Sequence, residues 1–150
     1  MTHGPRVSTA ARVLDASALL AYLQRESGCE AVVLTGSAIS TVNWSEVVQK
    51  AVQAGLDPEG LGDEVAAHGL RMIDLTARRA ESVALLWART RNAGLSLADR
   101  ACLALAAELA VPAVTTDRAW LAVDVGVEVI VVREGRPTDD RVRRRAALVR

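Results

Sequence analysis

The pattern of hydrophobic and polar positions alternates between short apolar runs and longer amphipathic stretches. The apolar runs predict five strands, at 12–15, 38–43, 70–75, 112–117 and 127–132. The runs at 113–116 and 127–132 are almost free of charge, which is typical of strands in a parallel sheet that is buried on both faces. Strands that alternate with helices predict an open α/β sandwich.

The amphipathic stretches predict helices between these strands. They lie at 16–26, 26–34, 44–55, 56–69, 76–94 and 96–110. Gly55 is a plausible end for the third helix and Gly94 for the fifth. Ala80, Val83, Ala84 and Trp87 are spaced to share one buried face, so we interpret Trp87 as part of the core.

The length and composition point to a single domain. The chain has 150 residues and no repeat, low-complexity stretch or linker, so we expect a core at about 12–132, with a leader at 1–11 and a charged tail at 133–150. No apolar run approaches the roughly 18 residues that cross a membrane, and the first residues lack the apolar part of a signal peptide. We therefore expect a cytoplasmic protein.

The charge and the cysteines narrow the function little. Lys and Arg together number 18, as do Asp and Glu, so the overall field gives no evidence for or against nucleic acid. Lys50 is the only lysine. Arginine suits contacts with RNA phosphate, but a GC-rich genome explains the bias equally well. We interpret Cys29 and Cys102 as small hydrophobic residues, because no spacing indicates a zinc site.

Four acidic residues follow the predicted strands or begin the predicted helices. Asp15 ends the first strand, Glu46 opens the helix after the second, Asp99 lies in the first turn of the helix from Ser96, and Asp117 ends the fourth strand. Ligands of open α/β sheets bind at the carboxyl ends of the strands. The four carboxylates are therefore expected at one edge of the sheet.

Each acid also has a purely structural interpretation. Asn43 with Glu46, and Ser96 with Asp99, have the spacing of a capping box. Asp15 and Asp117 can each cap the following helix. Taken together, however, four converging carboxylates repel one another unless a hard cation compensates, and oxygen-only ligands favour Mg²⁺ or Mn²⁺.

Other catalytic chemistry is poorly supported. His3 and His68 are the only histidines, and we expect both at the surface. Without a histidine partner, a serine hydrolase is disfavoured, and no glycine-rich phosphate loop is present. A water molecule activated by a cation, with in-line displacement at phosphate, is the remaining interpretation.

The sequence resembles a PIN domain, and specifically the VapC-type toxins of bacterial toxin–antitoxin pairs. The resemblance covers about 12–132 and rests on "VLDASALLAYLQRE", "ISTVNWSEV" and "GLSLADRACLALAAELAVPAVTTDRAWLAV", followed by an apolar strand. Trp44, where smaller apolar residues are commoner, and the arginine-rich end of the chain depart from the family pattern.

The resemblance implies a fold and an activity. The fold is a three-layer α/β/α sandwich with a central parallel sheet of about four or five strands. The activity is metal-dependent hydrolysis of phosphodiester bonds in structured RNA, either transfer or ribosomal RNA, which inhibits translation. The metal-site and catalytic acids are Asp15, Glu46, Asp99 and Asp117, supported by Thr115. The implied partners are a second copy of the chain and a VapB-like antitoxin, with no membrane.

Further side chains are weaker candidates. Leu19, Leu20, Tyr22 and Leu23 are candidates for the antitoxin groove, with packing in the core as the alternative. Trp120 is a candidate for stacking on a base, although a single Trp in an amphipathic segment is more often core. Arg100 and Arg118 are candidates for RNA contact, with a surface role equally plausible.

Two other classes of protein remain open. The stretch "DASAL" partly mimics the ligand motif of von Willebrand factor A domains, which would make the chain a metal-binding interaction module without nuclease turnover. A phosphotransferase or receiver domain would use Asp15 as the acceptor, but the second aspartate and the late lysine of such proteins are missing. Neither alternative accounts for Glu46, Asp99 and Asp117 together.

Overall fold

The computed structural model describes residues 10–25 and 28–132. Five parallel strands form one sheet in the order β3-β2-β1-β4-β5. Their bounds are β1 Arg12–Leu14, β2 Ser37–Ser40, β3 Arg71–Ile73, β4 Ala113–Thr115 and β5 Val129–Val131. The chain adds β2 and β3 on one side of β1 and then returns to add β4 and β5 on the other, so β1 lies in the centre.

Successive residues of the central strands serve two separate cores. Val13 and Ala113 pack in a cluster on one face, and their neighbours Leu14 and Val114 pack in a cluster on the other. This period of two follows from the pleat of a strand. Because both faces are apolar, both must be covered by helices.

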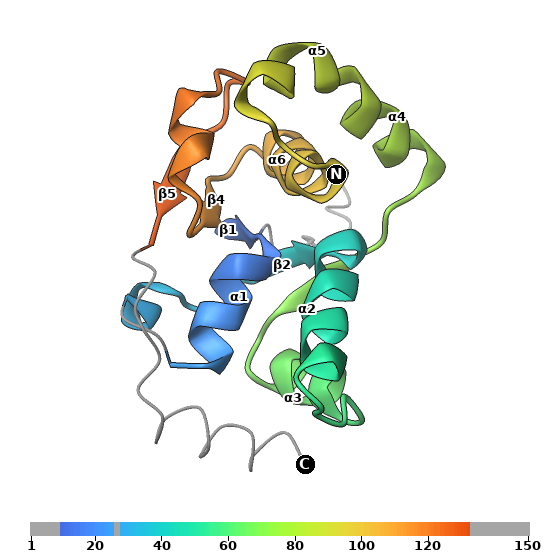
Figure 1. The fold of residues 1–150 in the computed structure, drawn as a ribbon, viewed down its shortest axis with the longest axis vertical. Coiled ribbons are helices and arrows are strands. Elements are labelled where there is room, and N and C mark those ends of the chain that lie inside the picture. Colours follow the sequence, from blue (N-terminus) through green and yellow to red (C-terminus); the bar gives the residue numbers. More distant parts are fainter. Residues whose placement is uncertain (1–9, 26–27, 133–150) are drawn as a thin grey trace, which may run out of the picture.

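Helices cover the sheet on both faces, as Figure 1 shows. Their bounds are α1 Ala16–Leu23, α2 Thr41–Gln53, α3 Leu61–Ala67, α4 Ala77–Leu85, α5 Trp87–Thr90 and α6 Leu97–Leu109, with the 3₁₀ helices η1 Cys29–Ala31, η2 Arg91–Ala93 and η3 Arg118–Ala122. The first three helices supply one core and α6 supplies the other, while α4 packs on the outer side of α6. The predicted three-layer sandwich with a parallel sheet is confirmed.

The helix predicted at 26–34 is wrong. Within its described part, only the single turn η1 is helical, and Gly28 before it has a φ of 90°. Val32 and Leu34 are buried while Val33 between them is exposed. This alternation of buried and exposed side chains is typical of extended chain, and it explains why the predicted helix does not form over these residues.

The single helix predicted at 76–94 is also wrong, because the chain bends at Leu86. The hydroxyl of Thr90 donates to the Leu86 carbonyl, at 2.9 Å, and Leu86 packs in the core beside α6. Of the four positions predicted to face the core, only Val83 is buried, and Trp87 is 54% exposed. The bend turns Leu86 inward and leaves Trp87 outside.

The start of α2 differs from the predicted capping box. The helix begins at Thr41, and the Ser40 hydroxyl caps it by accepting from the Val42 amide. Asn43 therefore lies inside the first turn, where it is fully buried, and it does not cap the helix. Glu46 is consequently free of any capping role. The predicted end at Gly55 is confirmed, with a φ of 77°.

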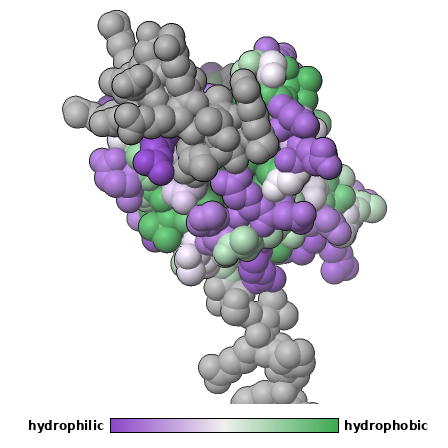
Figure 2. All heavy atoms as spheres, turned by 90° about the horizontal axis from the view of Figure 1, so that it is seen from below, coloured by the Kyte–Doolittle hydropathy of each residue, from purple (hydrophilic) through white to green (hydrophobic). Residues whose placement is uncertain are grey.

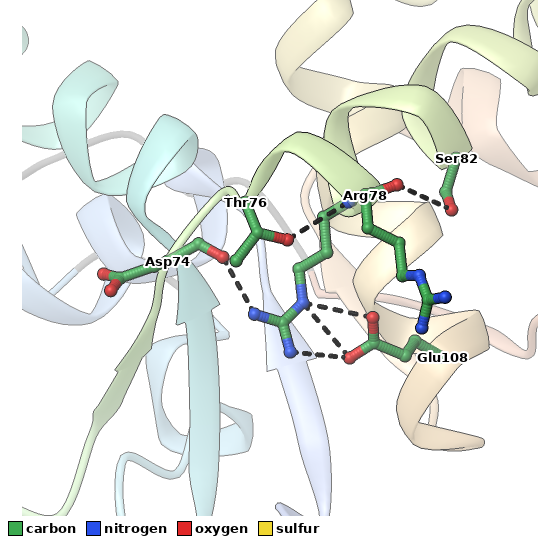
Figure 3. A network of polar contacts seen from close by, with 6 residues as sticks. Asp74, Thr76, Arg78, Ser82 and Glu108 are labelled. Atoms are coloured by element: carbon green, nitrogen blue, oxygen red, sulfur yellow. Dashed lines mark hydrogen bonds and ion pairs between the residues drawn. The ribbon is translucent and has the colours of Figure 1, made fainter.

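A polar network attaches α4 to α6 (Figure 3). The Arg79 guanidinium donates to both Glu108 carboxylate oxygens, at 2.9 to 3.2 Å, and to the carbonyl of Asp74, at 3.0 Å. Thr76 caps α4 through the Arg79 amide. Arginine matches a carboxylate in this two-point geometry, which fixes direction as well as distance. The network holds the N-terminal end of α4 beside the C-terminal half of α6.

The outer surface is mixed in character. In the view of Figure 2, hydrophilic side chains run across the visible face, and hydrophobic ones form small separate groups. Within the described residues, no helix has the length and apolar character needed to cross a membrane. Cys102 is buried and Cys29 partly buried, and both are free thiols, so the expectation of small hydrophobic residues holds best for Cys102.

Candidate metal centre at the carboxyl edge of the sheet

Asp15 lies at the carboxyl end of the central strand and is only 5% exposed. Its Oδ1 accepts from the Ala18 amide at 2.8 Å, which caps α1, and from the Ser17 hydroxyl at 2.7 Å. Its Oδ2 accepts from the Thr115 hydroxyl at 2.6 Å. These three hydrogen bonds, one of which is the helix cap, fix this carboxylate in one orientation.

The position of Asp15 is also a topological switch point. The chain runs from β1 to β2 on one side and places β4 on the other, so the crevice opens between the ends of β1 and β4. In open α/β sheets ligands bind in this crevice. Leu14 pairs with Val114 in the ladder, which brings Asp15 opposite Thr115.

Two hydroxyl groups join the end of β1 to the loop after β4. The Thr115 hydroxyl donates to Asp15 and accepts from the Asp117 amide at 3.1 Å. The Ser17 hydroxyl donates to the same carboxylate and accepts from the Thr116 amide at 3.0 Å. Ser17 was missed as a site residue, although its place two residues after an acid at a helix start was a usable signal.

Asp99 interacts electrostatically with both Asp15 and Glu46. It forms the predicted capping box with Ser96, in which its Oδ2 accepts from the Ser96 amide at 2.9 Å. Burial raises the pKa of Glu46, the negative charge of Asp99 raises it further, and Lys50 opposes the shift. The same Asp99 charge also raises the pKa of Asp15. Asp99 is therefore close enough to repel both.

Asn43 connects the turn that carries Glu46 to the turn that carries Asp99. Its Nδ2 donates to the Ala98 carbonyl at 3.0 Å, one residue before Asp99, and Glu46 follows it by one helical turn. Its Oδ1 is buried without a partner within the described residues. The local pattern predicted a capping role for Asn43, because a partner 55 residues away leaves no local signal.

Asp117 is the outermost of the four acids. It is exposed, and its Oδ1 caps η3 by accepting from the Ala119 amide at 2.9 Å. Its backbone amide, rather than its carboxylate, is linked to Asp15 through the Thr115 hydroxyl. Among residues 10–25 and 28–132, no three acidic, histidine or cysteine side chains are close enough to hold one ion. The structure thus places all four acids near the same edge without assembling them into a ligand set.

The donor chemistry of the four acids fits a hard divalent cation. All the donors are oxygens, and none of the four has an ion pair with a basic residue in the described part of the chain. Burial is the main cause of the raised pKa values of Asp15 and Glu46, and the negative charge of Asp99 adds to both. Lys50 offsets only part of the rise in the pKa of Glu46. A cation would relieve both the burial and the repulsion, and Mg²⁺ or Mn²⁺ prefers such ligands.

The burial of Asp15 predicts a pH dependence of stability. Desolvation raises the pKa of Asp15 from 3.8 to about 6, against the opposing effect of its hydrogen bonds. The folded state therefore holds a proton that the unfolded state releases between about pH 4 and 6. We expect the free energy of unfolding to fall by about 3 kcal/mol as the pH rises through this window.

Chemical denaturation of the metal-free chain from pH 4 to pH 8 measures this dependence. Asp15→Asn, which cannot ionise, should flatten the curve and be the more stable protein at pH 7. An equal slope in the wild type and in Asp15→Asn would show that Asp15 is not the group responsible.

The candidates for contact with RNA or antitoxin differ in how far their side chains are buried. Trp120 is fully buried, so its ring offers no face to a base and the stacking expectation is corrected: it is a core residue. Arg100 is partly buried and its Nη1 donates to the Val83 carbonyl at 3.1 Å, so it links α6 to α4 rather than facing RNA. Arg118 is exposed. Leu19 and Leu23 lie in the core, while Leu20 and Tyr22 pack against it and are partly exposed.

The chain is an α/β protein with a parallel sheet, and acidic side chains gather near the switch point at the carboxyl edge of that sheet. The family model described as "PIN domain" matches residues 12–126, and the chain belongs to this family. PIN domains are generally nucleases, so the family supports a hydrolase. A comparison with curated proteins found no match.

Solved structures share the fold. A toxin–antitoxin complex from Klebsiella pneumoniae is 20% identical with a TM-score of 0.58, covering 82% of this chain and 98% of that one. VapBC2 from Rickettsia felis, bound to a promoter DNA fragment, is 14% identical with a TM-score of 0.56, covering 81% and 98%. VapBC-5 from Mycobacterium tuberculosis is 23% identical with a TM-score of 0.52, covering 83% and 98%.

Proposed function

We propose that the chain is a Mg²⁺- or Mn²⁺-dependent endoribonuclease. The observation that carries the proposal is the buried Asp15 carboxylate at the switch point of a PIN fold, with Asp99 in electrostatic reach of both Asp15 and Glu46. Asp15, Glu46, Asp99 and Asp117 would hold the ion. When bound, the ion would activate water and neutralise charge on the phosphate during an in-line displacement.

The residues around the acids have supporting roles in this proposal. Thr115 and Ser17 hold the Asp15 carboxylate in one orientation and tie it to the loop that carries Asp117. Asn43 keeps the Glu46 turn of α2 beside the Asp99 turn of α6. Partners of this kind set the orientation of ligating carboxylates, and their loss typically costs about 10- to 100-fold in metal affinity or activity.

We further propose the biological role of a VapC-type toxin. It would cut structured RNA, either transfer or ribosomal, inhibit translation and be silenced by a VapB-like antitoxin. Support comes from the fold neighbours, of which two are VapBC proteins and one is described as a toxin–antitoxin complex. The partly exposed Leu20 and Tyr22 on α1 are the candidates for antitoxin contact, and a homodimer is the expected assembly.

The direct experiment incubates the purified chain with transfer RNA, ribosomal RNA and DNA of matched sequence. Internal cleavage of RNA with Mg²⁺ or Mn²⁺, lost in EDTA, is the expected result. Undiminished cleavage in EDTA contradicts the proposal. Metal binding without any RNA turnover would favour the interaction module instead.

The toxin role has its own test. A small open reading frame beside the gene, with a DNA-binding N-terminal part, is the expected arrangement. Its product should co-purify with the chain and suppress RNA cleavage. Active cleavage in the presence of every neighbouring gene product would contradict the toxin role and leave the nuclease standing.

A further inference from the structure

An exposed aromatic and basic surface is formed mainly by α5 and the residues that flank it. Figure 1 shows α5 at the end of the molecule opposite α3. Its apolar members are Leu85, which is 80% exposed, Trp87, which is 54% exposed, and Leu121 of η3, which is 59% exposed. Its exposed arginines are Arg89, Arg91 and Arg118. We name these six residues the arginine–tryptophan face. Two segments of the chain, 85–97 and 118–122, carry these residues. The segments are adjacent, because η2 contacts η3.

The backbone beneath this face is held firmly. Thr90 is buried and its hydroxyl bonds to the Leu86 carbonyl, while Arg100 donates from α6 to the Val83 carbonyl. Leu86 and Trp120 pack in the core directly under the two segments. Trp87 is therefore an exposed side chain on an anchored support, and it loses little further freedom when a ligand binds.

The face carries one sign of charge. No acidic residue occurs within 85–97 or 118–122, although the chain as a whole is neutral. None of the three arginines has an ion pair within the described residues, and the Arg91 guanidinium lies over the Trp87 ring, 5.4 Å from its centroid. Positive charge beside an exposed indole suits a ligand with both phosphates and flat bases.

The face also borders the candidate metal centre. Asp99 follows the first segment by two residues, and Asp117 directly precedes the second. A strand of nucleic acid bound on the face would thus pass close to Asp99 and Asp117.

We propose that the arginine–tryptophan face is the surface on which the RNA substrate docks, with one base stacked on Trp87 and phosphates held by Arg91 and Arg118. The proposal rests on the endoribonuclease function and adds the surface that holds the RNA. A second copy of the chain is a poorer occupant, because a two-fold contact here would set two copies of the same positively charged surface against each other.

Fluorescence anisotropy with a short labelled single-stranded RNA tests the proposal, in the Asp99→Asn background to prevent cleavage. Trp87→Ala should weaken binding about 5- to 150-fold, the range for losing one stacked base. Arg91→Ala should also weaken binding and reduce the salt slope by about 0.7. Arg78→Ala, which removes an exposed arginine at the far end of α4, is the matched control and should leave affinity unchanged.

Unchanged RNA affinity in Trp87→Ala, or no RNA binding by the parent protein, overturns the proposal. So does a change in sedimentation caused by Trp87→Ala, because it would make the face a protein interface. These outcomes are separate from failure of the proposed function, which shows as absent cleavage by the wild type. Circular dichroism confirms folding, which Trp87→Ala should retain because the side chain is exposed.

Discussion

Asp99→Asn should reduce metal-dependent RNA cleavage at least about 100-fold while the protein stays folded. Asp99 is the acid whose charge reaches both Asp15 and Glu46, so its loss removes a shared ligand of the proposed site. The fold should survive, because an asparagine oxygen can still accept from the Ser96 amide in the capping box.

The measurement is the initial rate of RNA cleavage at saturating Mg²⁺, with thermal unfolding as the check on folding. Asp63→Asn is the matched control, since it makes the same chemical change at an exposed position of α3. Cleavage by Asp99→Asn at the wild-type rate would remove Asp99 from the site and weaken the metal-nuclease account as a whole.

Trp120→Ala should destabilise the protein by about 3–5 kcal/mol, because Trp120 is the largest of the fully buried side chains. For a chain of this size, the unfolding temperature should fall by roughly 6–20 °C. Trp120→Phe should lose much less, since it keeps an aromatic ring and removes a buried indole N–H that has no partner among the residues the structure describes.

Thermal unfolding of the two variants separates a core role from an RNA role. The core interpretation requires that RNA affinity per folded molecule stays constant in Trp120→Phe. An unfolding temperature in Trp120→Ala equal to that of the wild type, together with weakened RNA binding, would instead restore the stacking role that burial opposes.

The sheet, and the helix-cap positions of several acids of the candidate site, could be predicted from local sequence. Strand periodicity places Val13 and Leu14 on opposite faces, and this is a property of neighbouring residues alone. Asp15 and Asp117 act as helix caps as their positions indicated, and Ser96 with Asp99 forms the expected capping box. Each of these acids therefore caps a helix and also lies near the candidate site, so the two interpretations do not exclude each other.

The errors came from interactions between residues distant in sequence. The helical spacing from Thr76 to Gly94 gave no sign that Leu86, rather than Trp87, would turn into the core. Asn43 looked like a cap because its true partner, Ala98, belongs to another helix. Trp87 and Trp120 both lie in amphipathic segments, and only the packing of α6 and η3 decides that one is outside and the other inside.

Calorimetric titration of Mn²⁺ into the RNA-free chain measures whether Asp15, Glu46, Asp99 and Asp117 bind a divalent cation. If they do, the wild type should show saturable binding at pH 7 and proton release from Asp15 near pH 6, and Asp99→Asn should bind at least about 10-fold more weakly. Absence of binding, or equal binding by Asp99→Asn and the wild type, would contradict the proposed metal site.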